Sequence, residues 1–149
     1  MNPNPAQVVS YCVQDIQTKL QSIADLQGKS VFVFNETDLI EKTKVVTSYP
    51  VVGVLYEGLR GMPSTGATSH LGLSAEVVFS IIVATRTQQL VNADIKHPTL
   101  NLLDSIRNLF LDQISPTGHK YKFMVEAANV VNGSVMWVQR WALPVQLKH

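Results

Sequence analysis

Apolar residues recur three or four positions apart near the start of the chain, and this spacing predicts an amphipathic helix from Ala6 to Leu26. The expected apolar stripe consists of Val9, Val13, Ile16, Leu20 and Ile23. Gln27-Gly28-Lys29 follows as a stop signal, with Gly28 able to adopt a left-handed cap. The spacing of Asp38 and Glu41 is that of a capping box, so a short helix is expected from Leu39 to Lys44.

A second helical stripe predicts a helix that runs from Pro98 to about Ile114. Either Asp94 or His97 can cap it, and Pro98 suits its first turn. Pro116-Thr117-Gly118 is expected to mark its end. The predicted stripe consists of Leu100, Leu103, Ile106, Phe110 and Ile114.

Runs of β-branched and aromatic residues predict strands. Asn132-Gly133 joins the last two as a hairpin, because both residues tolerate positive φ angles. Proline lacks an amide donor, so Pro50 is expected at a strand start or on an edge, and Pro144 at an edge or an irregularity. The predicted strands are Val31–Phe34, Tyr49–Tyr56, Leu73–Arg86, Tyr121–Val131 and Val135–Leu147.

The strand from Leu73 to Arg86 alternates between an apolar and a more polar face. Val78 and Ile82 fall on the more polar face. Two interpretations of these residues stand side by side: a patch that another subunit covers, or a second thin layer of the same chain.

Together these elements predict a single α+β domain over residues 1–149. We expect a mainly antiparallel sheet of four to five strands, with two long helices packed on one face. Residues 57–72 contain four glycines and Pro63, and they predict a long Gly-rich loop. Loops of this length are uncommon in compact domains unless they have a function.

Only 15% of the residues are charged, against about 25% in an average protein. This shortage of charge suggests a subunit whose flanks are covered by neighbours. The net charge is +1 and no basic run occurs, which disfavours a dedicated nucleic-acid-binding protein. The first residues show no signal peptide, and the longest apolar run is too short to span a membrane. The single cysteine fits synthesis in a reducing cytoplasm.

Candidate chemistry is sparse. Residues 61–68 have the glycine spacing of a phosphate-binding loop, but Ala67 stands where the essential lysine is needed. Cys12 lies near the helical stripe, where a buried and inert thiol is the favoured interpretation. The four histidines have no metal-ligand spacing. We therefore expect no catalytic residue, cofactor or metal, and the chain is predicted not to be an enzyme.

Two further features favour structural roles. Glu126 lies opposite residues 138–140 in the predicted hairpin, so a cross-strand ion pair with Arg140 is expected. Trp137 and Trp141 are four apart on one strand and face the same way. Core packing is the favoured interpretation for these two residues, and a subunit contact is the alternative.

With these elements placed, the chain resembles the tail-terminator (tail-completion) proteins of long-tailed phages. The resemblance covers about residues 6–145 and consists of pattern and order. It includes the N-terminal helix, the strand YPVVGVLYEG before the Gly-rich loop, and the long strand AEVVFSIIVATR. The helix LNLLDSIRNLF and a closing hairpin that ends in WVQRWALPV complete it.

The resemblance implies a homohexameric ring in the virion that caps the head-proximal end of the tail tube. Such a ring stops tube polymerisation and gives the head a docking surface. The implied partners are other copies of the chain, the tail tube protein, a head-completion protein and, in sheathed tails, the sheath protein. No membrane and no specific nucleic acid is implied. The predicted contact residues are Arg60, Met62, Thr65, Ser69, His70, Val78 and Ile82.

Two alternatives remain at this point. The first is another head–tail connector, neck or baseplate subunit, which differs in its assembly partners. The second is a small-ligand-binding domain in which residues 58–72 act as a lid. A protein of that second class would be a monomer and would respond to small ligands in a thermal-shift experiment.

Overall fold

Helix α1 (Pro5–Gln21) opens the computed structural model, which describes residues 5–27, 30–34, 50–61, 73–86, 98–131 and 134–147. A 3-10 turn, η1 (Ala24–Leu26), follows it. The helix is shorter than predicted because Ile23 adopts extended backbone, which ends the α-helical hydrogen bonding. The fully buried stripe is Val8, Cys12, Ile16 and Leu20, while Val9, Val13 and Ile23 are only partly buried beside it.

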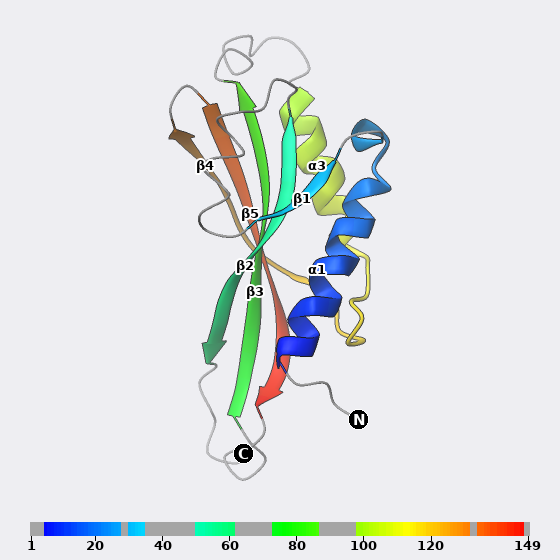
Figure 1. Ribbon diagram of the computed structural model, residues 1–149, viewed down its shortest axis with the longest axis vertical. Helices are drawn as coiled ribbons and strands as arrows, with labels where there is room; N and C mark the ends of the chain where they lie inside the picture. Colours follow the sequence, from blue (N-terminus) through cyan, green and yellow to red (C-terminus); the bar gives the residue numbers. More distant parts are fainter. Residues whose placement is uncertain are drawn as a thin grey trace.

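The five strands are β1 (Val31–Phe34), β2 (Val51–Gly61), β3 (Leu73–Arg86), β4 (Lys122–Val131) and β5 (Ser134–Leu147). The second helix, α3 (Pro98–Leu111), lies between β3 and β4 in the chain. Among the described residues the strands form one sheet in the order β1-β2-β3-β5-β4 (Figure 1). The prediction of an α+β fold with a five-stranded sheet and two helices is therefore confirmed.

Two details of the predicted sheet and helices are wrong. The sheet is mixed, because β1 runs parallel to β2 while the other three pairs are antiparallel. The helices, with 17 and 14 residues, are also shorter than predicted. α3 ends at Leu111, and Ile114 instead pairs with Lys120 in an isolated bridge, where it is exposed. Leu100 is also exposed, and Leu102 takes its place in the buried stripe.

Both helices cover the same side of the sheet, which we call the helix face (Figure 1). Because side chains alternate along a strand, Val77, Phe79, Ile81 and Val83 of β3 lie on this face. They form the main core with both helices and with Trp141 of β5. The core-packing interpretation of the tryptophans is confirmed, since Trp141 is fully buried and Trp137 packs against the same core.

The opposite side of the sheet, the second face, carries a smaller apolar cluster. Phe34, Val51, Ile82, Ala84 and Met136 are all buried there. Gly53 lies under the ring of Phe34: a Cβ atom at this glycine would be 2.2 Å from Phe34 Cε2 and 2.7 Å from the Phe32 carbonyl oxygen. Glycine at this position therefore lets β1 pack tightly against β2.

β2 continues past the predicted end at Tyr56 and takes in residues that were assigned to the loop. A register shift between Tyr56 and Gly58 accommodates the extension, and Gly58 adopts a positive φ of 137°. The rest of the predicted loop, like the predicted helix from Leu39 to Lys44, lies outside the described residues. Pro50 immediately precedes β2, as predicted for a proline at a strand start.

The closing hairpin has the predicted register, with Val131 opposite Ser134. β5 is not an edge strand over most of its length, because it lies between β3 and β4. β4 begins at Lys122, opposite Ala142, so Pro144 pairs only with Glu76 of β3. At Pro144, β5 has no β4 residue opposite it, so this part of β5 is a local edge, as predicted. A proline is tolerated there because no β4 residue requires its amide as a donor.

Candidate interaction surface

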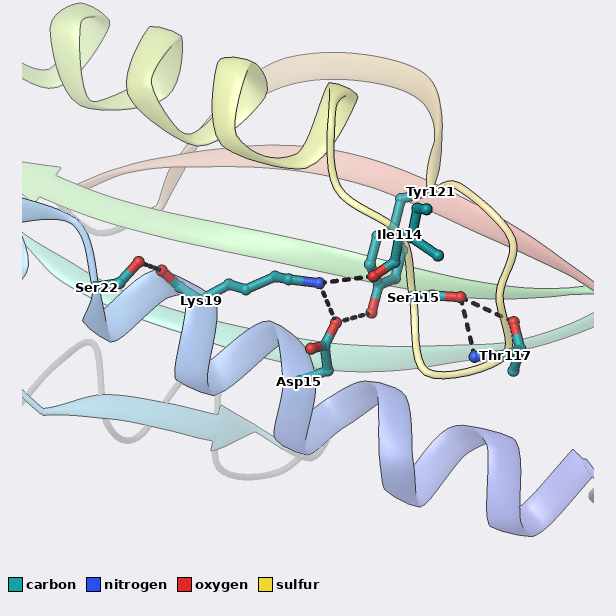
Figure 2. Close-up of polar contacts among 7 residues, drawn as sticks. All are labelled: Asp15, Lys19, Ser22, Ile114, Ser115, Thr117 and Tyr121. Atoms are coloured by element: carbon teal, nitrogen blue, oxygen red, sulfur yellow. Dashed lines mark hydrogen bonds and ion pairs between the residues drawn. The ribbon is translucent and has the colours of Figure 1, made fainter.

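The buried polar groups of the molecule connect its elements to one another. Tyr121, just before β4, donates a hydrogen bond of 2.7 Å to Asp15 Oδ2 on α1 (Figure 2). Lys19 Nζ lies 2.7 Å from the same carboxylate oxygen and 3.0 Å from the carbonyl oxygen of Ile114. The ammonium group also lies 5.4 Å from the centre of the Tyr121 ring. These contacts fasten the segment between α3 and β4 onto α1.

The same segment is held from within by a tight turn. Ser115 Oγ lies 2.8 Å from Thr117 Oγ1 (Figure 2). The amide of Gly118 donates to the carbonyl oxygen of Ser115. Gly118 has a φ of 86°, in the region that favours glycine. The Pro116-Thr117-Gly118 stop signal therefore forms this turn, and the helix has already ended at Leu111.

Cys12 is fully buried beside this cluster. Burial raises the pKa of the Cys12 thiol to about 11, and the neighbouring hydrogen bond with Tyr121 offsets only part of the rise. Burial, followed by the hydrogen bond to Asp15, also raises the pKa of Tyr121 well above its usual range. A thiol that stays protonated at neutral pH has little thiolate for covalent catalysis.

A second, partly buried polar chain links α3, β4 and β5. Arg107 Nη1 lies 2.7 Å from Glu126 Oε1, and Gln139 Nε2 donates to the same oxygen at 2.8 Å. Gln139 is fully buried and also donates to the carbonyl oxygen of Leu103 at 3.0 Å. Gln139 Oε1 in turn accepts a long hydrogen bond of 3.4 Å from Trp141.

The predicted ion pair between Glu126 and Arg140 is therefore wrong, although the hairpin register behind it is right. Glu126 lies opposite Gln139, and its side chain is on the helix face, where it meets α3. Arg140 is the next residue along β5, so its side chain is on the second face. There it pairs with Glu57 at 2.9 Å.

Arg60, one of the predicted contact residues, belongs to an ion cluster on the second face near the end of β2. Its guanidinium lies 2.5 Å from Oε1 of Glu76, and Lys122 Nζ lies 3.9 Å from Oε2. The Glu76 carboxylate is almost completely buried, whereas the side chains of Arg60 and Lys122 are 52% and 63% exposed. The structure thus gives Arg60 an internal partner, and its contact with another protein stays a prediction.

Val78 and Ile82, also predicted as contacts, are buried on the second face, with exposures of 8% and 2%. Their burial agrees with the interpretation of a second layer within the same chain, because little of either side chain is left for a partner. Their role as contacts remains untested. The other predicted contacts, Met62, Thr65, Ser69 and His70, lie outside the described residues.

Three exposed valines lie elsewhere on the surface, on strands of the sheet. Val130 of β4 is 68% exposed and Val125 is 42% exposed, while Val33 of β1 is 44% exposed. Among the described strands, these three residues lie on the two outermost, β1 and β4. Sequence reasoning missed them because a valine in a strand is equally typical of a core, and the periodicity does not tell which strand is outermost. The remaining exposed groups are Tyr11, Tyr56, Leu59, Leu100, Leu111 and Ile114.

Other kinds of site find no support in the described residues. No group of three or more His, Cys, Asp or Glu residues there is arranged to hold a metal ion. No helix in the same ranges is long and apolar enough to cross a membrane.

A scan of the sequence against protein-family models found no match, and no curated protein matches it either. The function therefore has to be inferred from the surface and from the order of the elements. That surface offers exposed apolar side chains and a few ion pairs. Such groups suit contact with other protein chains.

Proposed function

We propose that this chain is a structural subunit of a phage tail, the tail terminator. In this role it forms a homohexameric ring at the head-proximal end of the tail tube. The ring stops tube polymerisation and offers the head its docking surface. The chain acts through contacts between proteins and carries out no reaction.

The observation that carries the proposal is the placement of exposed apolar side chains on both outer strands of one sheet. A ring of identical subunits needs two different surfaces on opposite flanks of each copy. Val33 lies on one outer strand, and Val125 and Val130 lie on the other. The low share of charged residues supports the same conclusion, since flanks hidden in a ring need few charges.

The order of the elements is consistent with the proposal. Within the described residues the chain runs from α1 through β1, β2 and β3 to α3, and ends with the β4–β5 hairpin. This is the order on which the resemblance to tail terminators rests. The three antiparallel strand pairs agree with the mainly antiparallel sheet that the sequence pattern predicts.

The proposal assigns different surfaces to different partners. Copies of the chain meet along the flanks of the sheet, while the predicted Gly-rich loop is assigned to contact with the tail tube protein or the lumen. The head-completion protein and, in a sheathed tail, the sheath protein then bind the exposed rims of the ring. The ring belongs to the virion.

Electron microscopy of the purified full-length chain tests the proposal. Negative-stain class averages should show an annulus with six-fold symmetry. Added to polymerising tail tube protein from the same phage, the chain should cap one end of each tube and limit its growth. A monomer that shows a thermal shift with small ligands, or tubes that grow unchanged, would reject the proposal.

A further inference from the structure

The half of the second face nearest the end of β2 carries a layer of charged side chains. Arg60 of β2 and Glu76 of β3 are direct partners in the sheet, with 2.5 Å between the guanidinium and the carboxylate. Lys122 Nζ lies 3.9 Å from the same carboxylate group. Arg140 of β5 pairs with Glu57 of β2 at 2.9 Å. We call these three cations and two carboxylates the ionic surface.

Two of these contacts cross an intervening strand. β2 and β5 are not neighbours, so the pair of Glu57 and Arg140 passes over β3. The contact of Lys122 with Glu76 passes over β5 in the same way. The strand positions beneath these contacts carry short, buried side chains, which leave room for the long charged ones. These positions are Val78, Ser80 and Ala142. The contacts therefore join β2, β3, β5 and β4 into one continuous surface.

The ionic surface presents its positive charges to water and keeps its negative charges close to the sheet. The side chains of Arg60, Lys122 and Arg140 are 52%, 63% and 49% exposed, against 5% for Glu76 and 26% for Glu57. An approaching molecule therefore meets the cations first. Because two carboxylates neutralise three cations only in part, the local potential that it meets is positive.

Each cation also keeps hydrogen-bonding capacity for a partner. Within the described residues, Arg60 binds Glu76 through one terminal nitrogen and Arg140 binds Glu57 through Nε. A guanidinium carries five N–H donors, so further donors remain on both arginines. Lys122 Nζ is 3.9 Å from its carboxylate oxygen, beyond hydrogen-bond distance. Donors of this kind suit the carboxylate groups of acidic side chains.

An exposed apolar group borders the cations. Val125 of β4 is directly opposite Arg140 in the sheet, so both side chains lie on the second face. Val125 is one of the exposed valines of the outer strands. A partner that combines carboxylates with an apolar side chain would contact both groups at once. Such a combination is typical of protein interfaces, in which arginine is enriched.

A different protein fits this surface better than a nucleic acid or a second ionic surface does. A nucleic acid carries a charge at every phosphate, and its binding depends on cations that neutralise those phosphates. Here Glu57 and Glu76 lie among the cations and would repel the phosphates. The ionic surface of a second copy would bring like charges together, which is unfavourable.

We propose that the ionic surface binds the acidic surface of a different protein, whose carboxylates pair with Arg60, Lys122 and Arg140. The inference rests on the proposed function, in which further proteins bind the rims of the ring. It assigns one of those contacts to the end of the sheet where β2 stops and β3 begins (Figure 1). Because the cations are about half exposed, salt weakens the contact.

Binding of a dye-labelled poly-glutamate peptide to the full chain tests the inference, with fluorescence anisotropy at low salt as the measurement. Lys122→Glu should weaken binding about ten-fold, because it reverses an exposed charge of the ionic surface. Lys120→Glu is the matched control, since it changes the net charge equally in the segment that pairs with Ile114, before β4 begins. The control should change the dissociation constant by less than about two-fold.

Glu57→Gln separates the proposed role from a loss of folding. It frees Arg140 from its internal carboxylate, so poly-glutamate should bind about three-fold more tightly. A damaged or unfolded variant would not gain affinity. Equal affinity of Lys122→Glu, Glu57→Gln and the unmodified chain for the peptide would overturn the inference, and so would the absence of binding to all three.

Two further measurements decide which class of partner the surface serves. Tighter binding of a single-stranded oligonucleotide than of the peptide, lost in Lys122→Glu, would assign the surface to nucleic acid and overturn the inference. Native mass spectrometry of Lys122→Glu should give the same assembly as the unmodified chain. Loss of the ring in this variant alone would make the surface a contact between copies, which overturns the inference and leaves the proposed function intact. An unmodified chain that is monomeric at every concentration would overturn the proposed function, whatever the result with the peptide.

Discussion

The thiol of Cys12 is fully buried, and its surroundings disfavour the reactive thiolate form. Burial raises the pKa of the thiol to about 11, while an unfolded chain leaves it near 8.5. The folded state therefore holds its proton over a pH range in which the unfolded state has lost it. In that range a rise in pH favours unfolding.

We therefore expect the free energy of unfolding to fall as the pH rises from about 8.5 toward 11. Urea denaturation at a series of pH values measures the slope. Cys12→Ala should remove the part of the slope that belongs to the thiol, and the part above about pH 10 that belongs to Tyr121 should remain. At pH 8 the native thiol should react with a thiol reagent only after unfolding. Rapid reaction in the native protein would contradict this account.

Glu126 is expected to stabilise the fold more than Glu57, because Glu126 binds both Arg107 and Gln139 whereas Glu57 pairs with Arg140. Glu126→Leu removes the acceptor shared by Arg107 and Gln139 and should cost about 1–3 kcal/mol. Glu57→Leu breaks only the partly exposed pair with Arg140 and should cost less than about 1 kcal/mol. Urea midpoints of both variants provide the measurement. Equal losses would show that the buried polar chain has no special role.

The two carboxylates also show what the sequence can and cannot predict about a residue. The Asn132-Gly133 turn fixes which residues of β5 face Glu126, and that prediction is confirmed by the register with Gln139. The partner of Glu126 depends on how α3 packs on the hairpin, which the spacing along β4 and β5 does not contain. The ion pair with Arg107 therefore could not be predicted from the turn.

At the scale of elements, the tight contact between β1 and β2 depends on Gly53. A Cβ atom there would overlap the Phe34 ring and the backbone carbonyl oxygen of Phe32. We expect Gly53→Ala to reduce the free energy of unfolding by about 1–3 kcal/mol, since the overlap forces β1 outward. Gly61→Ala is the matched control in β2, because no atom lies within 4 Å of the added carbon. A stable Gly53→Ala variant would show that β1 shifts easily.

Element boundaries followed the sequence where local signals were strong. β1 and β3 have the predicted bounds, because β-branched runs and strict alternation are local properties. The direction of β1 and the end of β2 were not predicted. The direction of β1 relative to β2 could not be predicted, because the sequence between the two strands carries no signal for a parallel pairing. The end of β2 could not be predicted, because it depends on a register shift between Tyr56 and Gly58 that lets a glycine-containing segment remain in the sheet.

At the scale of the whole molecule, the contact residues predicted within the Gly-rich loop remain a prediction. Replacing residues 62–69 with a short Gly-Ser linker should leave the folded core unchanged, because the core residues lie in the helices and strands. If the loop contacts the tube, tails assembled with this variant should be abnormal in length. Tail length measured by electron microscopy decides the question, and normal tails of normal length would reject the role of the loop.

The central claim is that copies of this chain cover one another's flanks. Native mass spectrometry of the purified, untagged chain tests it most directly, over a range of protein concentrations. We expect one dominant species with six times the mass of the 16.5 kDa chain. A single species of 16.5 kDa that persists at the highest concentration would contradict it.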